Sequence, residues 1–218
     1  MSPLLRVLAN EVQIAALIFM AAAYGLRIAW LLRFPMPKER TLPAGNASSG
    51  ARLSLMSIAR PGAMESARKK PGFYLQFVGF HVGVAAAIGA TFIIPYRPEF
   101  FQDRAVVFLF QAVIGAALVI GILRLVRRIS NPAVRRISAP DDYLSLGLMI
   151  LFFLAAILAI PWKPGRPEGP SILFFGLTAF FLVYVPFSKI GHYLYYPFSR
   201  IMLGRVLGHR GAMGKGTP

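Results

Sequence analysis

Five long apolar runs dominate this sequence and restrict what it can fold into. They cover Gln13–Leu32, Phe73–Ile94, Ala105–Leu123, Tyr143–Trp162 and Ser171–Ser188, and the fifth helix is expected to continue to His192. A helix of about 20 apolar residues crosses the roughly 30 Å hydrocarbon core of a bilayer. The sequence therefore predicts an all-α membrane protein, a bundle of five transmembrane helices that forms one integral membrane domain over residues 1–218.

The composition agrees with a membrane protein. Hydrophobic residues make up 56% of the chain and charged residues 15%, whereas soluble domains have about 45–50% and about 25%. The five runs use most of the 218 residues, which leaves no room for a soluble catalytic module. The chain has no cysteine, which excludes disulfides, iron–sulfur ligation by this chain and covalent haem attachment.

The basic residues are distributed unevenly between the two ends of the runs. Of the 24 Lys and Arg, nineteen lie in residues 27–73, in residues 124–142 or from residue 189 onward. Cytoplasmic loops carry this excess in membrane proteins. We therefore expect an outside N-terminus and a cytoplasmic C-terminus in a multi-pass protein of the inner (cytoplasmic) membrane. Because the charges flank the spans, they argue against nucleic acid as a partner.

Two cytoplasmic loops follow from this topology. Residues 35–71 are rich in Pro, Gly, Ala, Ser and basic residues without an apolar period, so we expect little helix there and ordering against a partner or the lipid headgroups. Residues 124–142 carry arginine pairs at 127/128 and 135/136. These arginines are either topology signals or a docking site for an acidic cytoplasmic subunit, and the sequence leaves both interpretations open.

Two histidines lie within apolar helices on different spans. His81 lies in the charge-free run Phe73–Ile94, and His192 lies at the end of the fifth run. An imidazole in hydrocarbon costs free energy unless its nitrogens have partners. By the topology above, His81 lies about 12 Å in from the cytoplasmic edge, and His192 lies at the same side. Two histidines at matched depth predict an axially bis-ligated haem, as in a membrane cytochrome b.

Small residues surround His81, namely Gly79, Gly83, Ala85 and Gly89. They either let a flat macrocycle approach the helix or serve ordinary small-residue helix packing, and the sequence favours neither. His209 lies in the polar tail, where we expect it to contact solvent or a partner and not a metal.

Two short motifs carry a family resemblance. The five-span layout, Phe80-His81-Val82-Gly83-Val84, and the run from Pro186 to His192 followed by Pro197 resemble the gamma subunit of respiratory nitrate reductase, a cytochrome b family. Family members of this type carry two b haems. The resemblance implies that His81 and His192 hold the iron of the inner haem.

The chain departs from this family at the outer haem. The matching positions are Thr91 and Phe174, and neither residue is a usual haem ligand. We therefore expect one haem b per chain. The departure puts in doubt the family's transmembrane electron path and its outer quinol site.

The resulting hypothesis is an electron-transfer subunit of a membrane-bound, quinone-linked oxidoreductase in a respiratory chain. Electrons would pass between a cytoplasmic iron–sulfur or flavin subunit and membrane quinone. Lys189, Arg200 and Arg27 are candidate contacts for the haem propionates. Tyr24, Gln76, Tyr193 and Tyr196 are polar groups near the inner edge that could face quinone or anchor the helices in the interface.

Two other classes of protein fit the same sequence. One is a non-redox membrane anchor that recruits a cytoplasmic enzyme complex. The other is a small transporter or proton channel that uses His81. Only the cytochrome would show a b-type absorption band.

Overall fold

The computed structural model describes residues 1–35, 39–58, 68–161 and 167–213. All regular structure among these residues is helical, and Trp162, the expected end of the fourth span, lies outside them. Within the described residues, five helical stretches are long and apolar enough to cross a membrane: Pro3–Leu32, Pro71–Tyr96, Arg104–Ser130, Pro140–Ala159 and Gly169–Phe187. The prediction of an all-α fold with five helices able to span a membrane is therefore confirmed for this part of the chain, whereas the orientation of the spans stays a prediction.

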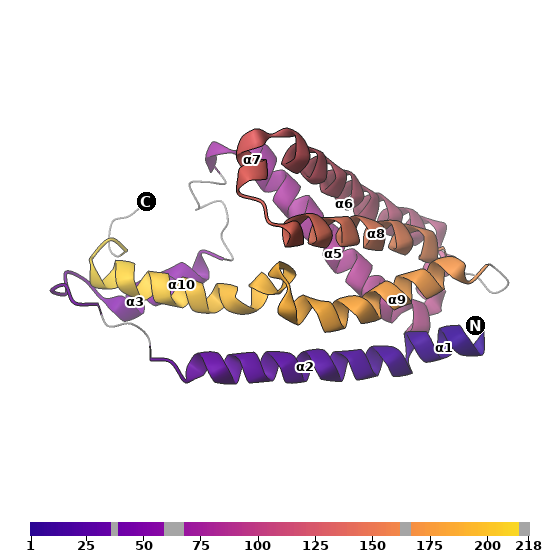
Figure 1. Ribbon diagram of the computed structural model, residues 1–218, viewed down its shortest axis with the longest axis horizontal. Helices are drawn as coiled ribbons and strands as arrows, with labels where there is room; N and C mark the ends of the chain where they lie inside the picture. The colour runs from indigo at the N-terminus through magenta and orange to yellow at the C-terminus, as the bar shows by residue number, and fades with distance from the viewer. Residues whose placement is uncertain (36–38, 59–67, 162–166, 214–218) are drawn as a thin grey trace. The chain divides into compact units, whose positions relative to one another are not determined.

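Each candidate membrane span consists of one or two of the helices labelled in Figure 1. The first joins α1 (Pro3–Ala9) to α2 (Glu11–Leu32), and the second is α5 (Pro71–Tyr96). The third and fourth are α6 (Arg104–Ser130) and α8 (Pro140–Ala159), and the fifth is α9 (Gly169–Tyr184) with the 3₁₀ turn η3 (Val185–Phe187). Shorter elements are α3 (Ala47–Met56), η2 (Pro98–Gln102), α7 (Pro132–Arg136), η4 (Lys189–Gly191) and α10 (His192–His209).

The chain's contacts divide it into two compact units, which are described separately. The first contains residues 1–23 and 75–190, and the second contains residues 24–74 and 191–218. One integral membrane domain over residues 1–218 stays a prediction.

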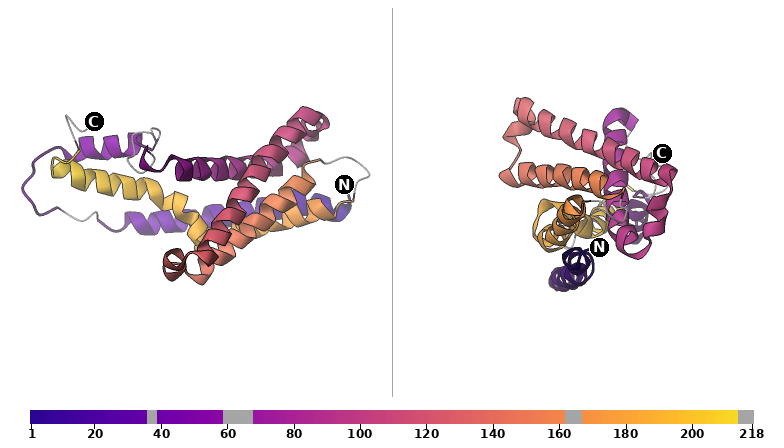
Figure 2. Two further views of the ribbon diagram at one scale, coloured as in Figure 1. Left: turned by 90° about the horizontal axis from the view of Figure 1, so that it is seen from above. Right: turned by 90° about the vertical axis from the view of Figure 1, so that its right-hand side faces the viewer.

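An aromatic core holds the first unit together. α8 packs against both α6 and α9, as Figure 2 also shows. Phe152 of α8 stacks on Phe174 of α9 with ring centroids 5.3 Å apart and meets Phe181 edge to face at 5.3 Å. The ring of the adjacent Phe153 meets Phe80 of α5 edge to face, with centroids 5.3 Å apart. Since lipid tails are as apolar as these rings, close packing of this kind is the main force between membrane helices.

Glycines let α5 approach α6 closely. A Cβ added to Gly83 would overlap the Cβ of Ala117, and one added to Gly79 would lie 2.9 Å from Cδ1 of Ile120. Gly79 and Gly83 therefore serve the packing of α5 on α6.

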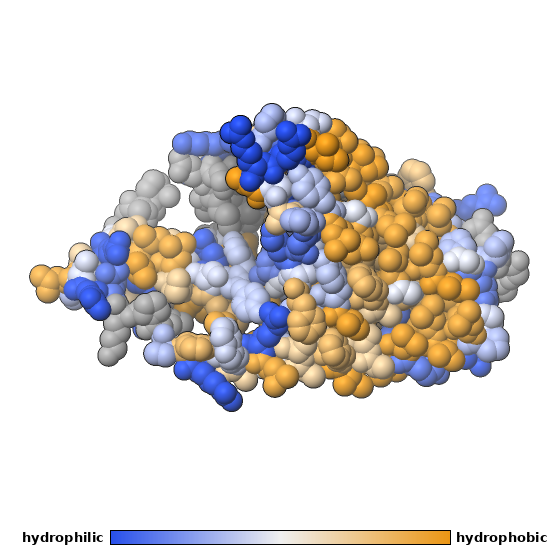
Figure 3. Space-filling model, viewed as in Figure 1, coloured by the Kyte–Doolittle hydropathy of each residue, from blue (hydrophilic) through white to orange (hydrophobic). Residues whose placement is uncertain are grey.

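The outer surface of the first unit is strongly apolar. Figure 3 shows hydrophobic side chains covering α6, α8 and α9. Phe108 on α6 is 73% exposed, and its neighbour Leu109 is also exposed. Contiguous exposed surface of this kind marks a protein that meets a membrane or another protein.

The second unit contains a helix pair, α3 and α10, which lie side by side in Figures 1 and 2. Glycines make the contact: Gly50 faces Gly204 and Gly208, and a Cβ on Gly204 would lie 2.6 Å from Cβ of Ser54. Asn46 caps α3 by accepting a hydrogen bond from Ser49 N–H at 3.0 Å. The expectation of little helix in residues 35–71 is therefore wrong for Ala47–Met56, because the partner surface is supplied by α10.

The fifth span ends earlier than expected. The helix changes to a 3₁₀ turn at Val185, and Ser188 has an extended backbone with φ −105° and ψ 171°. Pro186 lacks the N–H that would continue the helical hydrogen bonds, which explains the break. His192 is consequently the first residue of a separate helix, α10, and not the end of a span that reaches residue 192.

Candidate functional site

His81 lies on α5, four residues after Phe77. Its Nδ1 lies 2.8 Å from the backbone oxygen of Phe77. Because a carbonyl oxygen only accepts, Nδ1 is the protonated donor in this hydrogen bond. Histidines that ligate metals use the same device, in which one ring nitrogen is held by a carbonyl and the other binds the metal.

The face of α5 that carries His81 is open. Phe77, His81, Ala85, Ile88 and Phe92 are all exposed, and their spacing of three and four residues places them on one side of the helix. Space is also open at Gly89, where an added Cβ would meet nothing within 4 Å.

The small residues around His81 do not all serve one purpose. Gly79 and Gly83 face α6, as described above, whereas Ala85 is exposed one turn after His81 and Gly89 has open space around it. Helix packing therefore accounts for Gly79 and Gly83. Whether Ala85 and Gly89 make room for a flat macrocycle stays a prediction.

His192 begins α10 directly after the buried Gly191. The imidazole is exposed, and its ring centroid lies 6.4 Å from that of Tyr193. His81 belongs to the first unit and His192 to the second. The pairing of the two imidazoles on one iron therefore stays a prediction.

The three cations expected near the propionates each contact protein groups. Lys189 Nζ lies 3.1 Å from Asp142 Oδ1, and Arg27 donates to the hydroxyl of Tyr195 at 2.8 Å. Arg200 donates to the backbone oxygen of Ser54 at 3.3 Å and to Oγ of Ser57 at 2.6 Å. Arg200 thus donates hydrogen bonds to two oxygen acceptors at the C-terminal end of α3. Its position in the sequence does not predict this structural contact.

Two of the four candidate quinone contacts lie together. The hydroxyls of Tyr24 and Tyr193 are hydrogen-bonded, and their rings meet edge to face at 5.8 Å. Tyr196 is 40% exposed on α10, and Gln76 is half-buried on α5. Tyr195, which the sequence did not single out, joins this group through Arg27.

Thr91 and Phe174, which the sequence resemblance matched to outer haem ligands, both contact protein groups. The hydroxyl of Thr91 donates to the backbone oxygen of Ile88 at 2.7 Å. Phe174 is fully buried in the aromatic core, stacked on Phe152. The match of these two positions to the family stays a prediction.

His209 has a contact within its own unit. Its Nε2 lies 2.7 Å from the backbone oxygen of Thr41, so Nε2 is the protonated donor. The neighbouring backbone oxygen of His209 accepts hydrogen bonds from Ala44 and Gly45 at 2.9 and 3.0 Å. His209 therefore fastens residues 41–45 to the end of α10, a contact that the sequence did not predict.

Sequence reasoning missed an acidic cluster at one end of the first unit. The hydroxyl of Tyr184 donates to Asp141 Oδ1 at 2.6 Å, and Ser145 Oγ lies 3.2 Å from that hydroxyl. Asp141 Oδ2 accepts from the backbone N–H of Lys189 at 3.4 Å. The available signal was two adjacent aspartates beside the arginine-rich segment, in a chain with only 8 acidic residues.

Asp142, the second aspartate, joins three elements. It accepts a hydrogen bond from Ala139 N–H at 2.7 Å and lies 3.3 Å from Arg128 NH1 and 3.1 Å from Lys189 Nζ. The carboxylate is 17% exposed. It connects the end of α6, the beginning of α8 and the turn η4.

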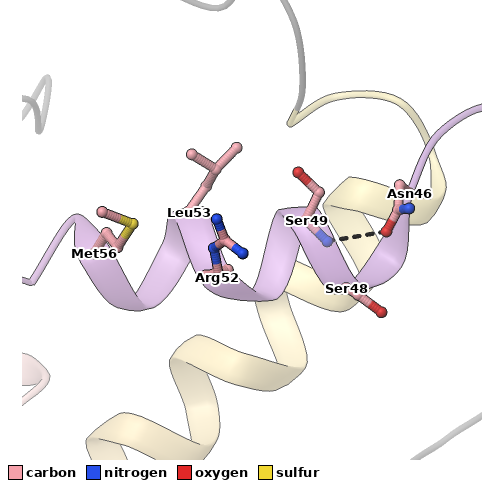
Figure 4. A pocket seen from close by; sticks show the side chains of 6 residues that line it. All are labelled: Asn46, Ser48, Ser49, Arg52, Leu53 and Met56. Atoms are coloured by element: carbon pink, nitrogen blue, oxygen red, sulfur yellow. Dashed lines mark hydrogen bonds between the residues drawn. The ribbon is translucent and has the colours of Figure 1, made fainter.

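A surface hollow of about 410 Å³ lies on α3 (Figure 4). Its lining comes from one helix and its cap: Asn46, Ser48, Ser49, Arg52, Leu53 and Met56. It contains none of the residues that the sequence predicted for a site.

Comparison with known proteins gives no match, either to a protein-family model or to a curated protein.

Proposed function

We propose that this chain is a mono-haem cytochrome b subunit of a membrane-bound oxidoreductase. His81 and His192 are its axial ligands, and it exchanges electrons between a cytoplasmic iron–sulfur or flavin subunit and membrane quinone. When bound between two imidazoles, a b haem is six-coordinate and supplies one-electron transfer without binding oxygen.

The observation that carries this proposal is the orientation of His81. The hydrogen bond from Nδ1 to the backbone oxygen of Phe77 at 2.8 Å holds the ring, so that Nε2 is the nitrogen that would bind the iron. The same ring lies on an exposed side of α5, one turn before the exposed Ala85. A ligand histidine in an apolar span needs both properties.

The proposed location is the inner (cytoplasmic) membrane, with the N-terminus outside. The five spans support a multi-pass protein, and the nineteen basic residues on one side support the orientation. The resemblance to the nitrate reductase gamma subunit rests on the residues around His81 and His192.

A non-redox membrane anchor for a cytoplasmic enzyme complex is the second candidate. The contacts of the three cations favour it. Arg200 binds Ser54 and Ser57, and Lys189 pairs with Asp142. Charges already engaged with protein groups contribute less to holding propionates.

A reduced-minus-oxidised spectrum of membranes that contain the chain separates the two candidates. The cytochrome predicts a b-type alpha band that disappears in His81→Ala and persists in His209→Ala, the control, since His209 Nε2 is engaged with Thr41. No band in the wild type would reject the cytochrome and favour a non-redox protein such as the anchor. A haemless His192→Ala complex that still exchanges electrons with quinone at the wild-type rate would also favour the anchor.

A further inference from the structure

The end of α6 and the short helix α7 form a rigid corner, here called the α6–α7 corner and comprising residues 124–138. Asn131 ends α6 by donating its N–H to the backbone oxygen of Arg127 at 3.0 Å. Its side chain begins α7 by accepting from Ala133 and Val134 N–H at 3.0 and 3.2 Å. An asparagine that caps two helices fixes the direction in which the chain turns.

Polar groups on the inner side of the corner satisfy one another. Arg128 donates to Ser138 Oγ at 2.6 Å and pairs with Asp142 at 3.3 Å. Ser138 in turn donates to the backbone oxygen of Val134 at 2.7 Å. These bonds tie the corner to the start of α8, so they hold α7 in place.

The outer side of the corner combines arginines with aliphatic side chains. Arg127, Arg135 and Arg136 are exposed. Ile137 is 82% exposed and Ile129 is 53% exposed. Figure 3 shows strongly hydrophilic side chains over α7 directly beside the hydrophobic surface of α6.

We propose that the α6–α7 corner binds the headgroup of an anionic phospholipid. Guanidinium groups bind phosphate oxygens through paired hydrogen bonds, so Arg127, Arg135 and Arg136 hold the phosphate. Ile129 and Ile137 meet the upper acyl chains. Basic residues next to a membrane span attract anionic lipid in this way.

Continuity with the lipid-facing surface favours a lipid over an acidic protein as the occupant. Along α6 the exposed side chains before the arginines are Val119, Ile122, Leu123 and Val126. The apolar face thus runs without interruption into the corner. A lipid places its acyl chains along the apolar face of α6 and its phosphate at the arginines, so it contacts both kinds of side chain. An acidic subunit would account only for the arginines and not for the apolar side chains that lead to them.

Native mass spectrometry of the purified full-length chain in neutral detergent tests this proposal. The probes are phosphatidylglycerol, phosphatidylcholine and inorganic phosphate. The wild type should bind phosphatidylglycerol well above phosphatidylcholine, and inorganic phosphate should not compete because it lacks acyl chains. Arg135→Gln/Arg136→Gln should weaken phosphatidylglycerol binding about 30-fold, since each arginine near anionic lipid contributes about fivefold.

The matched control is Arg97→Gln/Arg104→Gln, which removes two exposed arginines near the other end of α6. It should leave the affinity within about twofold of the wild type. Equal binding of both phospholipids, or an equal loss in both double variants, would overturn the proposal. So would unchanged lipid binding by Arg135→Gln/Arg136→Gln together with loss of a co-purifying acidic subunit, which would assign the corner to protein docking.

Discussion

Lys189 and Asp142 form an ion pair, with Nζ 3.1 Å from Oδ1, only three residues before His192 in the chain. The backbone N–H of Lys189 is also bound, by Asp141 at 3.4 Å. Both contacts hold η4, the turn that follows the break in the fifth span. The two aspartates thus hold Lys189 at the end of the first unit. Lys189 has this structural contact, and its role as a propionate contact stays a prediction.

Asp142→Asn should destabilise the protein by about 1–2 kcal/mol, because it leaves Arg128 and Lys189 without their carboxylate. The loss of stability is small because Lys189 is 55% exposed, and solvent weakens its attraction to the carboxylate. A fall of several degrees in the thermal unfolding midpoint in detergent is expected, by roughly 2–4 °C per kcal/mol. Asp103→Asn is the control: Asp103 caps α6 at Ala105 N–H, and an asparagine caps equally well. Equal midpoints for the two variants would mean that the ion pairs contribute nothing.

Gly204→Ala should separate α3 from α10. The new Cβ would lie 2.5 Å from the backbone oxygen of Gly50 and 2.8 Å from Cα of Ala51, and backbone atoms cannot move aside without cost. We expect about 1–3 kcal/mol of destabilisation, measured as faster hydrogen exchange of the α3 amides. Gly176→Ala on α9, where the space is open, should have no such effect. Unchanged exchange of α3 in Gly204→Ala would refute the close helix contact.

Glu39 should make the attachment of residues 39–45 to α10 sensitive to acid. Desolvation opposes its ionisation, but the hydrogen bond and charge of Arg210 and the N–H of Thr41 outweigh it and lower the pKa of Glu39. A lowered pKa adds stability that is fully present above the unfolded value of about 4.3 and is lost as pH falls through the folded value. Proteolysis of this segment should therefore accelerate below about pH 4.

The comparison variant for that experiment is Glu39→Gln. It should be cut quickly at every pH between 3 and 7, with the pH dependence gone. A wild-type segment equally resistant at both ends of this range would show that the Arg210–Glu39 contact at 2.9 Å does not hold it.

The fold was predicted best where periodicity and length decide it. The five long apolar helices follow from runs of apolar residues, which are long enough to cross a membrane. The α3–α10 pair could not be predicted, because α3 alone is a short, mildly polar segment that becomes helical against Gly204 and Gly208 of a distant segment. Pro186 indicated that the fifth helix could end near that residue. The sequence did not decide this, because a proline inside a membrane helix is often tolerated.

Only part of the candidate site could be predicted from the sequence. His81 could be identified because an imidazole in a charge-free run is rare. The hydrogen-bond partners of Lys189, Arg27 and Arg200 could not, since each one lies far away in sequence. Long cationic side chains reach many positions, and sequence spacing does not restrict which one they use.

The topology can be tested by labelling introduced cysteines, as the chain has none of its own. Ser49 lies exposed on α3 and Gly169 lies exposed at the start of α9. An impermeant thiol reagent applied to intact cells should label Gly169→Cys and spare Ser49→Cys. The reverse pattern would invert the proposed orientation.

Electron transfer should stay near the cytoplasmic side. Thr91 lies ten residues beyond His81, about 15 Å further along the helix, and provides no second ligand. Turnover with a quinol in proteoliposomes should therefore generate little membrane potential from this subunit. A potential as large as that of a two-haem relative would contradict this expectation.

The haem content of the purified complex, measured for the wild type and the ligand variants, decides whether His81 and His192 hold a haem. We expect one non-covalent b haem per wild-type chain with a low-spin bis-imidazole signature, none in His81→Ala or His192→Ala, and one in His209→Ala. Two haems per wild-type chain, or a bis-imidazole haem that survives in either ligand variant, would contradict it.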